Sequence, residues 1–179
     1  CPLCSKKRPS NILAAGNKEK MELILWRHAD AEDPGPQGDS ARRLTPKGEK
    51  QAARMARWLR PQLEGTWRVV VSPAVRALET VAPLDMSYEV RESVSTAAGP
   101  DSILAEAGWP HAGQVLVVGH QPTLGQVAAL LLGGESGEVS VRKGSILWFS
   151  TRERNGRNET VLRAVLDPDT LERHEKSAE

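Results

Sequence analysis

Three short, largely apolar runs limit what this chain can fold into, because each is followed by a stretch with the features of a helix. They lie at Leu23–Trp26, Trp67–Val71 and Gln114–Val118, and none contains Gly or Pro. Runs that are apolar at nearly every position are typical of strands buried on both faces of a parallel sheet. We therefore expect an α/β fold with three layers, in which a mostly parallel central sheet is flanked by helices.

Helix start and stop signals support this alternation. Thr45 and Pro46 form an N-cap followed by proline at the first helical position, and apolar residues recur at helical spacing until Pro61 ends the helix. Ser72 and Pro73 repeat the same device after the second apolar run. Shorter helices are expected at 101–107 and 123–132.

The C-terminal part of the chain predicts an antiparallel edge to the sheet. Ser145–Ser150 and Glu159–Leu166 alternate like strands around Asn155-Gly156, a dipeptide that favours a tight hairpin turn. A weak strand is expected near Tyr88–Arg91. The predicted sheet therefore combines a parallel centre with an antiparallel edge hairpin.

The length of 179 residues suits one domain, which we place at 21–166. Residues 1–20 are expected to form a disordered extension, and 167–179 a frayed polar tail. The net charge is +1 and basic residues are scattered, so we expect no nucleic-acid partner. No apolar run approaches the ~20 residues of a membrane helix, and the first residues lack the apolar core of a secretory signal, so we expect a cytoplasmic protein.

The two cysteines, Cys1 and Cys4, are spaced Cys-x-x-Cys at the start of the chain. A structural zinc site needs about four ligands, and the next histidine is His28, which we assign elsewhere. A redox motif of the thioredoxin type should lie between a strand and a helix, and this one does not. We interpret the pair as part of a non-functional extension.

Charged and imidazole side chains stand where the predicted strands end. Arg27 and His28 follow the first strand, Arg76 falls in the first turn after the second, and His120 follows the third. Taken alone, Arg27 could cap a strand and His28 could be a loop histidine. Because the carboxyl ends of parallel strands meet at one edge, we expect all four side chains to lie together.

Two guanidiniums and two imidazoles suit a tetrahedral oxyanion such as a phosphoryl group. Metal binding is the alternative, which we disfavour because no carboxylate ligand is evident and two cations would repel the ion. We expect no metal and no cofactor. His111 and His174 are interpreted as solvated.

At this point the sequence resembles the histidine phosphatase superfamily, whose signature Arg-His-Gly stands here as Arg27-His28-Ala29. The likeness covers 21–166, and the Asp39–Thr45 stretch and compact length are most similar to the SixA-type phosphohistidine phosphatases of bacteria. Three further motifs support the resemblance to the superfamily: Leu44-Thr45-Pro46-Lys47-Gly48 with Gln51, Ser72-Pro73-Ala74-Val75-Arg76-Ala77 with Thr80, and Gly119-His120-Gln121-Pro122 with Gly125. The resemblance implies a phosphoglycerate-mutase-like fold.

The resemblance also implies residue roles. His28 would be the nucleophile that accepts the phosphoryl group, and Arg27, Arg76 and His120 would bind the phosphoryl oxygens. Arg42 matches an arginine of the SixA-type loop and is expected to be a secondary oxyanion contact. A neutral His28 needs its second nitrogen to donate to a backbone carbonyl or carboxylate. Ala29 in place of glycine adds one methyl group, which we regard as tolerable.

The general acid of larger relatives is a carboxylate on an insert, and no insert of that size fits between Pro83 and Gly113. The carboxylates available there are Glu92 and Asp101, both expected to be surface residues more than proton donors. An imidazole leaves readily once protonated, whereas an alkoxide gains from a positioned acid. We therefore expect a monomeric phosphatase acting on phosphohistidine of a phosphorylated protein. The alternatives are a small-molecule phosphomonoesterase or mutase with the same nucleophile and, less favoured, a non-catalytic phosphate-binding module.

Overall fold

The computed structural model describes residues 21–111, 113–134 and 137–177. Its six-stranded sheet has the strand order β3-β2-β4-β1-β5-β6. Strands β1, β2, β3 and β4 run parallel, β5 pairs antiparallel with β1, and β6 pairs antiparallel with β5. The strands are β1 (Glu22–Arg27), β2 (Trp67–Val71), β3 (Glu89–Val90), β4 (Gln114–Gly119), β5 (Ile146–Arg154) and β6 (Arg157–Leu166). The mixed sheet with an antiparallel edge hairpin confirms the predicted fold class.

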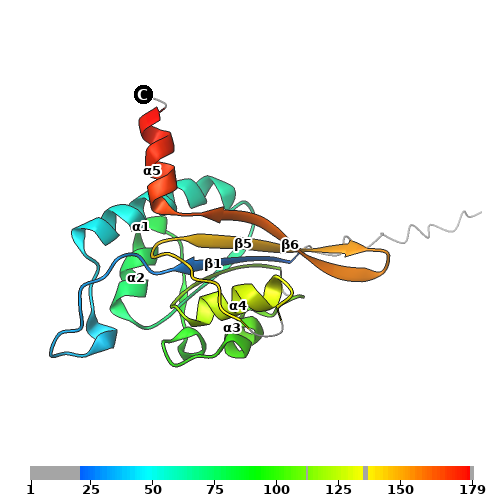
Figure 1. Ribbon diagram of the computed structural model, residues 1–179, viewed down its shortest axis with the longest axis horizontal. Helices are drawn as coiled ribbons and strands as arrows, with labels where there is room; N and C mark the ends of the chain where they lie inside the picture. Colours follow the sequence, from blue (N-terminus) through cyan, green and yellow to red (C-terminus); the bar gives the residue numbers. More distant parts are fainter. Residues whose placement is uncertain (1–20, 112, 135–136, 178–179) are drawn as a thin grey trace, which may run out of the picture.

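Helices cover both faces of the sheet, with α3 and α4 on one face and α1 and α2 on the other (Figure 1). The α-helices are α1 (Pro46–Leu59), α2 (Val75–Val81), α3 (Pro100–Ala107), α4 (Thr123–Leu131) and α5 (Pro168–Ser177). In the described residues, four 3₁₀ turns connect elements: η1 (Asp39–Ala41), η2 (Arg60–Gln62), η3 (Ala82–Leu84) and η4 (Glu92–Val94). No helix in the described part of the chain has the length and apolar character needed to cross a bilayer.

Strand β1 lies at the centre of the molecule, paired with β4 on one side and β5 on the other. Its side chains alternate between two cores: Leu23 and Leu25 pack under α3 and α4, and Ile24 and Trp26 pack under α1 and α2. All four are fully buried, and each such side chain stabilises the fold by roughly 1.5–3 kcal/mol. The end of β1 is therefore held from both faces, which makes it a rigid support for the residues that follow.

Helix α1 begins as predicted. The Thr45 side chain accepts a hydrogen bond from the Gly48 backbone N–H (3.0 Å), and Pro46 occupies the first turn. A Cβ atom at Gly48 would lie 1.9 Å from the Asp30 carbonyl oxygen, so the first turn abuts the loop that leaves β1. The helix start and the site-bearing loop are thus in direct contact.

One expectation about a helix boundary is wrong. Helix α2 starts at Val75 with Ala74 as its N-cap and no side-chain cap, although Ser72-Pro73 was expected to begin it. The Ser72 hydroxyl is instead in contact with an imidazole, described below. The same hydroxyl accepts from the Ala74 backbone N–H (3.3 Å), which precedes the helix, so Ser72 combines a local contact with a tertiary contact that the sequence pattern does not encode.

The tail at 167–179 was expected to be frayed, but its described part forms helix α5. The Asp167 carboxylate accepts hydrogen bonds from the backbone N–H groups of Asp169 and Thr170 (both 3.1 Å), so Asp167-Pro168 is an N-cap and first-turn proline. Glu175 of α5 forms ion pairs with Arg54 and Arg57 of α1. Residues 1–20, with Cys1 and Cys4, lie outside the described residues.

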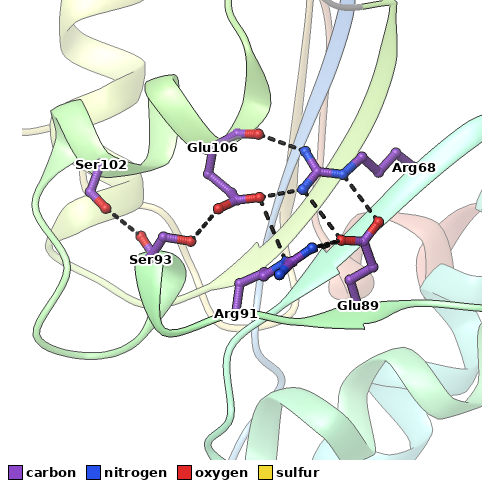
Figure 2. A network of polar contacts seen from close by, with 6 residues as sticks. All are labelled: Arg68, Glu89, Arg91, Ser93, Ser102 and Glu106. Carbon is purple, nitrogen blue, oxygen red and sulfur yellow. Dashed lines mark hydrogen bonds and ion pairs between the residues drawn. The ribbon is translucent and has the colours of Figure 1, made fainter.

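A polar network anchors the β3 edge of the sheet to α3 (Figure 2). Arg68 of β2 pairs with Glu89 of β3 and with Glu106 of α3, and Glu106 also accepts from the Ser93 hydroxyl (2.6 Å). Arg91 joins the same two glutamates. These contacts hold the segment between η3 and β4 against the body of the protein.

Candidate active site

The carboxyl edge of the sheet brings His28, Arg76 and His120 together. His28 follows β1 and His120 follows β4, and these neighbouring parallel strands place the two ring centroids 5.2 Å apart. Arg76 reaches the same point from the first turn of α2. All three side chains belong to buried residues, with exposed fractions of 3–6%. Three of the four side chains expected at this edge are therefore in mutual contact, and the fourth, Arg27, is directed toward Val141.

Arg76 lies between the two imidazoles. Its Nε donates to Nε2 of His28 (3.3 Å), and its Nη2 lies 3.4 Å from Nδ1 of His120. One edge of the guanidinium thus faces both rings. A fork of N–H donors flanked by two imidazoles matches the geometry of a tetrahedral oxyanion.

The hydrogen of the His28 ring is held on one nitrogen. Nδ1 lies 2.8 Å from the carbonyl oxygen of Ala29, and because a carbonyl only accepts, Nδ1 must carry the hydrogen. Burial is the main cause that lowers the pKa of His28 to about 3, while this hydrogen bond opposes the shift. The ring is therefore neutral at neutral pH, with the lone pair of Nε2 directed toward Arg76. The expectation of a carbonyl or carboxylate partner is met by the adjacent residue.

Thr80 fixes the backbone beside His28. Its hydroxyl accepts from the Ala29 backbone N–H (3.0 Å) and donates to the Arg76 carbonyl (2.6 Å). The side chain of Ala29 is fully buried. The two halves of the site, from β1 and from α2, are thus joined through one buried hydroxyl.

The His120 ring contacts a hydroxyl on its far side. Its Nε2 lies 2.7 Å from the Oγ of Ser72, a fully buried residue directly after β2. Burial, followed by the charge of Arg76, lowers the pKa of His120 to about 4. Both imidazoles are therefore neutral at neutral pH.

Arg27 points into the loop after α4, where its Nη1 donates to the carbonyl oxygen of Val141. Its Nε is buried and has no hydrogen-bond partner within 21–111, 113–134 and 137–177. Burial lowers the pKa of its guanidinium, which nevertheless stays a cation at neutral pH. A buried N–H of a cation without a partner is costly in a folded protein unless an acceptor arrives, and an anionic ligand would supply one.

A carboxylate that the sequence analysis did not select lies beside the cluster formed by His28, Arg76 and His120. Asp39 of η1 pairs with Nη2 of Arg76 (2.8 Å) through one oxygen and with Nη1 of Arg42 (3.0 Å) through the other. Its backbone carbonyl also accepts from Nη1 of Arg76 (2.6 Å). Hydrogen bonds from Arg42, and then from Arg76, hold the pKa of Asp39 below its usual range.

Arg42 is therefore linked to Arg76 through Asp39. Its Nε donates to the Glu32 carbonyl, which anchors it within the loop that follows β1. Asp39 lies in a loop rich in Gly, Pro and acidic residues, so no periodicity or strand-end position distinguished it. Only its place in the Asp39–Thr45 stretch could have drawn attention to it.

The other candidates lie elsewhere. Glu92 on η4 and Asp101 on α3 are exposed, and in the described residues neither hydrogen-bonds to Arg76 or to an imidazole of the cluster. His111 and His174 are exposed. No group of three or more His, Cys, Asp or Glu side chains that could hold a metal ion occurs within the described ranges.

A polar cavity of about 280 Å³ has Arg27, the residue before His28, in its lining. It lies between the start of α1, the loop before β5 and the start of α5. Its lining includes the cations Lys47, Arg142 and Lys143 and the carboxylates of Asp30 and Asp169. Lys143 pairs with Asp30 (2.7 Å), and Arg142 pairs with Asp169 (2.9 Å). The space beside Arg27 is thus lined by charged groups of both signs.

Comparisons with known proteins show the family to which the chain is similar. The family model described as histidine phosphatase superfamily (branch 1) matches residues 23–97, which include Arg27, His28 and Arg76. The chain is 31% identical over 132 residues to a phosphohistidine phosphatase SixA homolog of Haemophilus influenzae, an alignment covering 63% of this chain and 78% of that protein. It is also 31% identical over 128 residues to phosphohistidine phosphatase SixA of Escherichia coli, covering 65% and 77%.

Among solved structures, the chain is similar to the protein histidine phosphatase SixA complexed with tungstate. The TM-score is 0.68 at 27% identity, and the match covers 84% of this chain and 99% of that one. The similarity therefore extends beyond the residues matched by the family model and includes β4 and His120.

Proposed function

Since this chain belongs to the histidine phosphatase superfamily and is a phosphatase, we propose that it removes the phosphoryl group from phosphohistidine on a protein, with His28 carrying that group between two half-reactions. In the first, Nε2 of His28 bonds to phosphorus as the bond from phosphorus to the substrate nitrogen breaks, and that nitrogen takes up a proton. In the second, water attacks phosphorus and His28 leaves. Orthophosphate and the free protein histidine are the products.

His28 suits the nucleophilic role because it is neutral and its unprotonated nitrogen, Nε2, faces Arg76. The hydrogen bond from Nδ1 to the Ala29 carbonyl holds the tautomer and orientation of the ring. Neutrality at pH 7 follows from the lowered pKa of about 3. A protonated ring would have no lone pair to donate.

We assign Arg27, Arg76 and His120 to the phosphoryl oxygens. Phosphoryl transfer depends mainly on positioning and on donors aimed at charge in the transition state. Arg76 offers an edge that faces both rings, and Arg27 has a buried N–H without a partner in the described residues. Arg42, linked through Asp39, is the secondary contact that balances the charge of that carboxylate.

The observation that supports this substrate class is the ionisation state of Asp39, the carboxylate that pairs with Arg76. Asp39 is held ionised between two arginines, so it is a poor proton donor at neutral pH. Glu92 and Asp101 are exposed and do not hydrogen-bond to the cluster. A substrate whose leaving group takes its proton from solvent therefore suits this site, and an imidazole with a pKa near 6.5 is such a group.

A protein substrate fits the surroundings of the site. The segment from β3 to α3 is held on the body of the protein by the network of Figure 2. The loop at 32–40 beside the site is exposed at every residue. The relatives from Haemophilus influenzae and Escherichia coli are named as phosphohistidine phosphatases, which supports the same class here.

The test is a side-by-side rate comparison with a phosphohistidine protein, an aryl phosphate and an alkyl phosphate such as phosphoglycerate. We expect the phosphohistidine protein to be cleaved fastest and the alkyl phosphate slowest. Glu92→Gln and Asp101→Asn should each change the phosphohistidine rate by less than about tenfold, below the contribution of a general acid. His28→Ala should abolish an acid-labile, alkali-stable phosphoenzyme in quenched reactions. Phosphoglycerate as the best substrate would instead favour the small-molecule phosphatase.

A further inference from the structure

Ser72 contacts the His120 ring on the side opposite Arg76. Its backbone N–H donates to the Val118 carbonyl (3.1 Å), which fixes Ser72 beside β4, and the residue is fully buried. Oγ lies 2.7 Å from Nε2 of His120, whereas Nδ1 of the same ring lies 3.4 Å from Nη2 of Arg76. The two ring nitrogens therefore face a hydroxyl on one side and the phosphoryl-binding cation on the other.

The single hydrogen of a neutral His120 can satisfy only one of these neighbours. A guanidinium can only donate, so its contact with Nδ1 requires a lone pair there and places the hydrogen on Nε2. A phosphoryl oxygen can only accept, so it gains a donor from His120 only if the hydrogen is on Nδ1. Ligand binding and the contact with Arg76 thus favour opposite tautomers.

The hydroxyl of Ser72 can partner either tautomer. The Ala74 backbone N–H donates to Oγ (3.3 Å), which uses one lone pair and leaves the hydroxyl hydrogen free to be donated to Nε2. A carboxylate at this place would only accept and would hold the hydrogen on Nε2, away from the ligand. A side chain that both accepts and donates is therefore chemically matched to this position.

We propose that Ser72 is a positioning residue for the phosphatase reaction: with a phosphoryl group bound, its hydroxyl donates to Nε2 of His120, and the ring presents its hydrogen on Nδ1 to a phosphoryl oxygen. This rests on the proposed function only in requiring a phosphoryl group at the cluster. It holds for phosphohistidine and for phosphate esters alike.

The direct test is ¹⁵N NMR of the histidine side chains in the wild-type chain at pH 7.5, with and without saturating inorganic phosphate. We expect phosphate to give a His120 ring with a protonated Nδ1 and a bare Nε2. A ring protonated on Nε2 alone, or on both nitrogens, would overturn the proposal. If phosphate moves neither the His120 nor the His28 signals, the phosphoryl site itself fails, and with it the proposed function.

Variants give an independent measure. Ser72→Ala should lower kcat roughly ten- to hundredfold, the usual loss when a partner that orients a site imidazole is removed, and Ser72→Thr should restore much of it. Thr123→Val is the matched control, since it removes another buried hydroxyl, which donates to the Ala98 carbonyl (3.0 Å) and, in the described residues, to neither imidazole. It should keep the wild-type kcat and tautomer. A Ser72→Ala variant with wild-type kcat would refute the role, and the wild-type NMR experiment decides the matter if the variant does not fold.

Discussion

Lowering the pH from 7.5 to 5.5 should destabilise the protein through its two buried imidazoles. Their folded-state pKa values of about 3 for His28 and about 4 for His120 lie below the unfolded value of about 6.5. Within this window the unfolded state binds more protons, so the stability is complete above pH 6.5 and is lost as the pH falls toward the folded values. Each ring contributes about 1.4 kcal/mol between pH 7.5 and 5.5, about 2.7 kcal/mol in total.

Urea unfolding in a phosphate-free buffer measures this loss, and a thermal scan should show it as a fall in Tm of roughly 5–10 °C. Carboxylates contribute little, because pH 5.5 is still above their unfolded pKa values of about 4. His28→Asn should reduce the pH-dependent loss to about 1.4 kcal/mol, and His111→Gln, at an exposed position, should leave it unchanged. Equal stability at the two pH values would refute the neutrality of the imidazoles and the mechanism that depends on it.

Four further predictions follow from other contacts. Asp39→Asn should lower kcat/KM by more than Glu92→Gln does in the same assay, because only Asp39 joins two arginines of the site; equal effects would argue against its role. Gly48→Ala should lower the unfolding free energy by about 3 kcal/mol or more, since its Cβ would meet the Asp30 carbonyl, whereas Gly35→Ala, in open space, should be nearly neutral in urea titrations. Inorganic phosphate at a hundred times its Kd should stabilise the fold by about 2.7 kcal/mol in thermal scans, and no stabilisation would contradict an oxyanion site. Activity should survive dialysis against EDTA, because guanidiniums supply the positive charge; a loss restored by added metal would contradict this.

The sheet and the edge that bears the candidate site could be predicted because the sequence patterns that indicate them are local. Apolar runs such as Leu23–Trp26 specify buried parallel strands, and the carboxyl ends of those strands must share one edge. Arg76 and His120 could therefore be placed beside His28 without knowledge of the loops. The hairpin at Asn155-Gly156 is equally local, since both residues adopt positive φ angles (51° and 72°).

Contacts that cross between elements could not be predicted in this way. Asp39 meets Arg76 because an irregular loop folds back over α2, and no repeating pattern governs its path. The sequence predicts a helix cap at Ser72, but the Ser72 hydroxyl contacts the imidazole of His120, which follows β4. The α5 error has a different origin: the capping signal at Asp167-Pro168 was present, but the polar composition of the segment was given more weight.

The β5–β6 hairpin offers a place to extend this protein by engineering. The Ile146 end of β5 lies beside Trp26, next to the site, and the strand then runs away from it, so the turn at Asn155-Gly156 is at the far end and projects beyond the rest of the sheet (Figure 1). Residues 152–158 are all exposed. A fluorescent domain, an affinity tag or new chain termini introduced at this turn would leave the sheet edge that bears His28 and His120 accessible, so a reporter fused there could follow the enzyme during turnover.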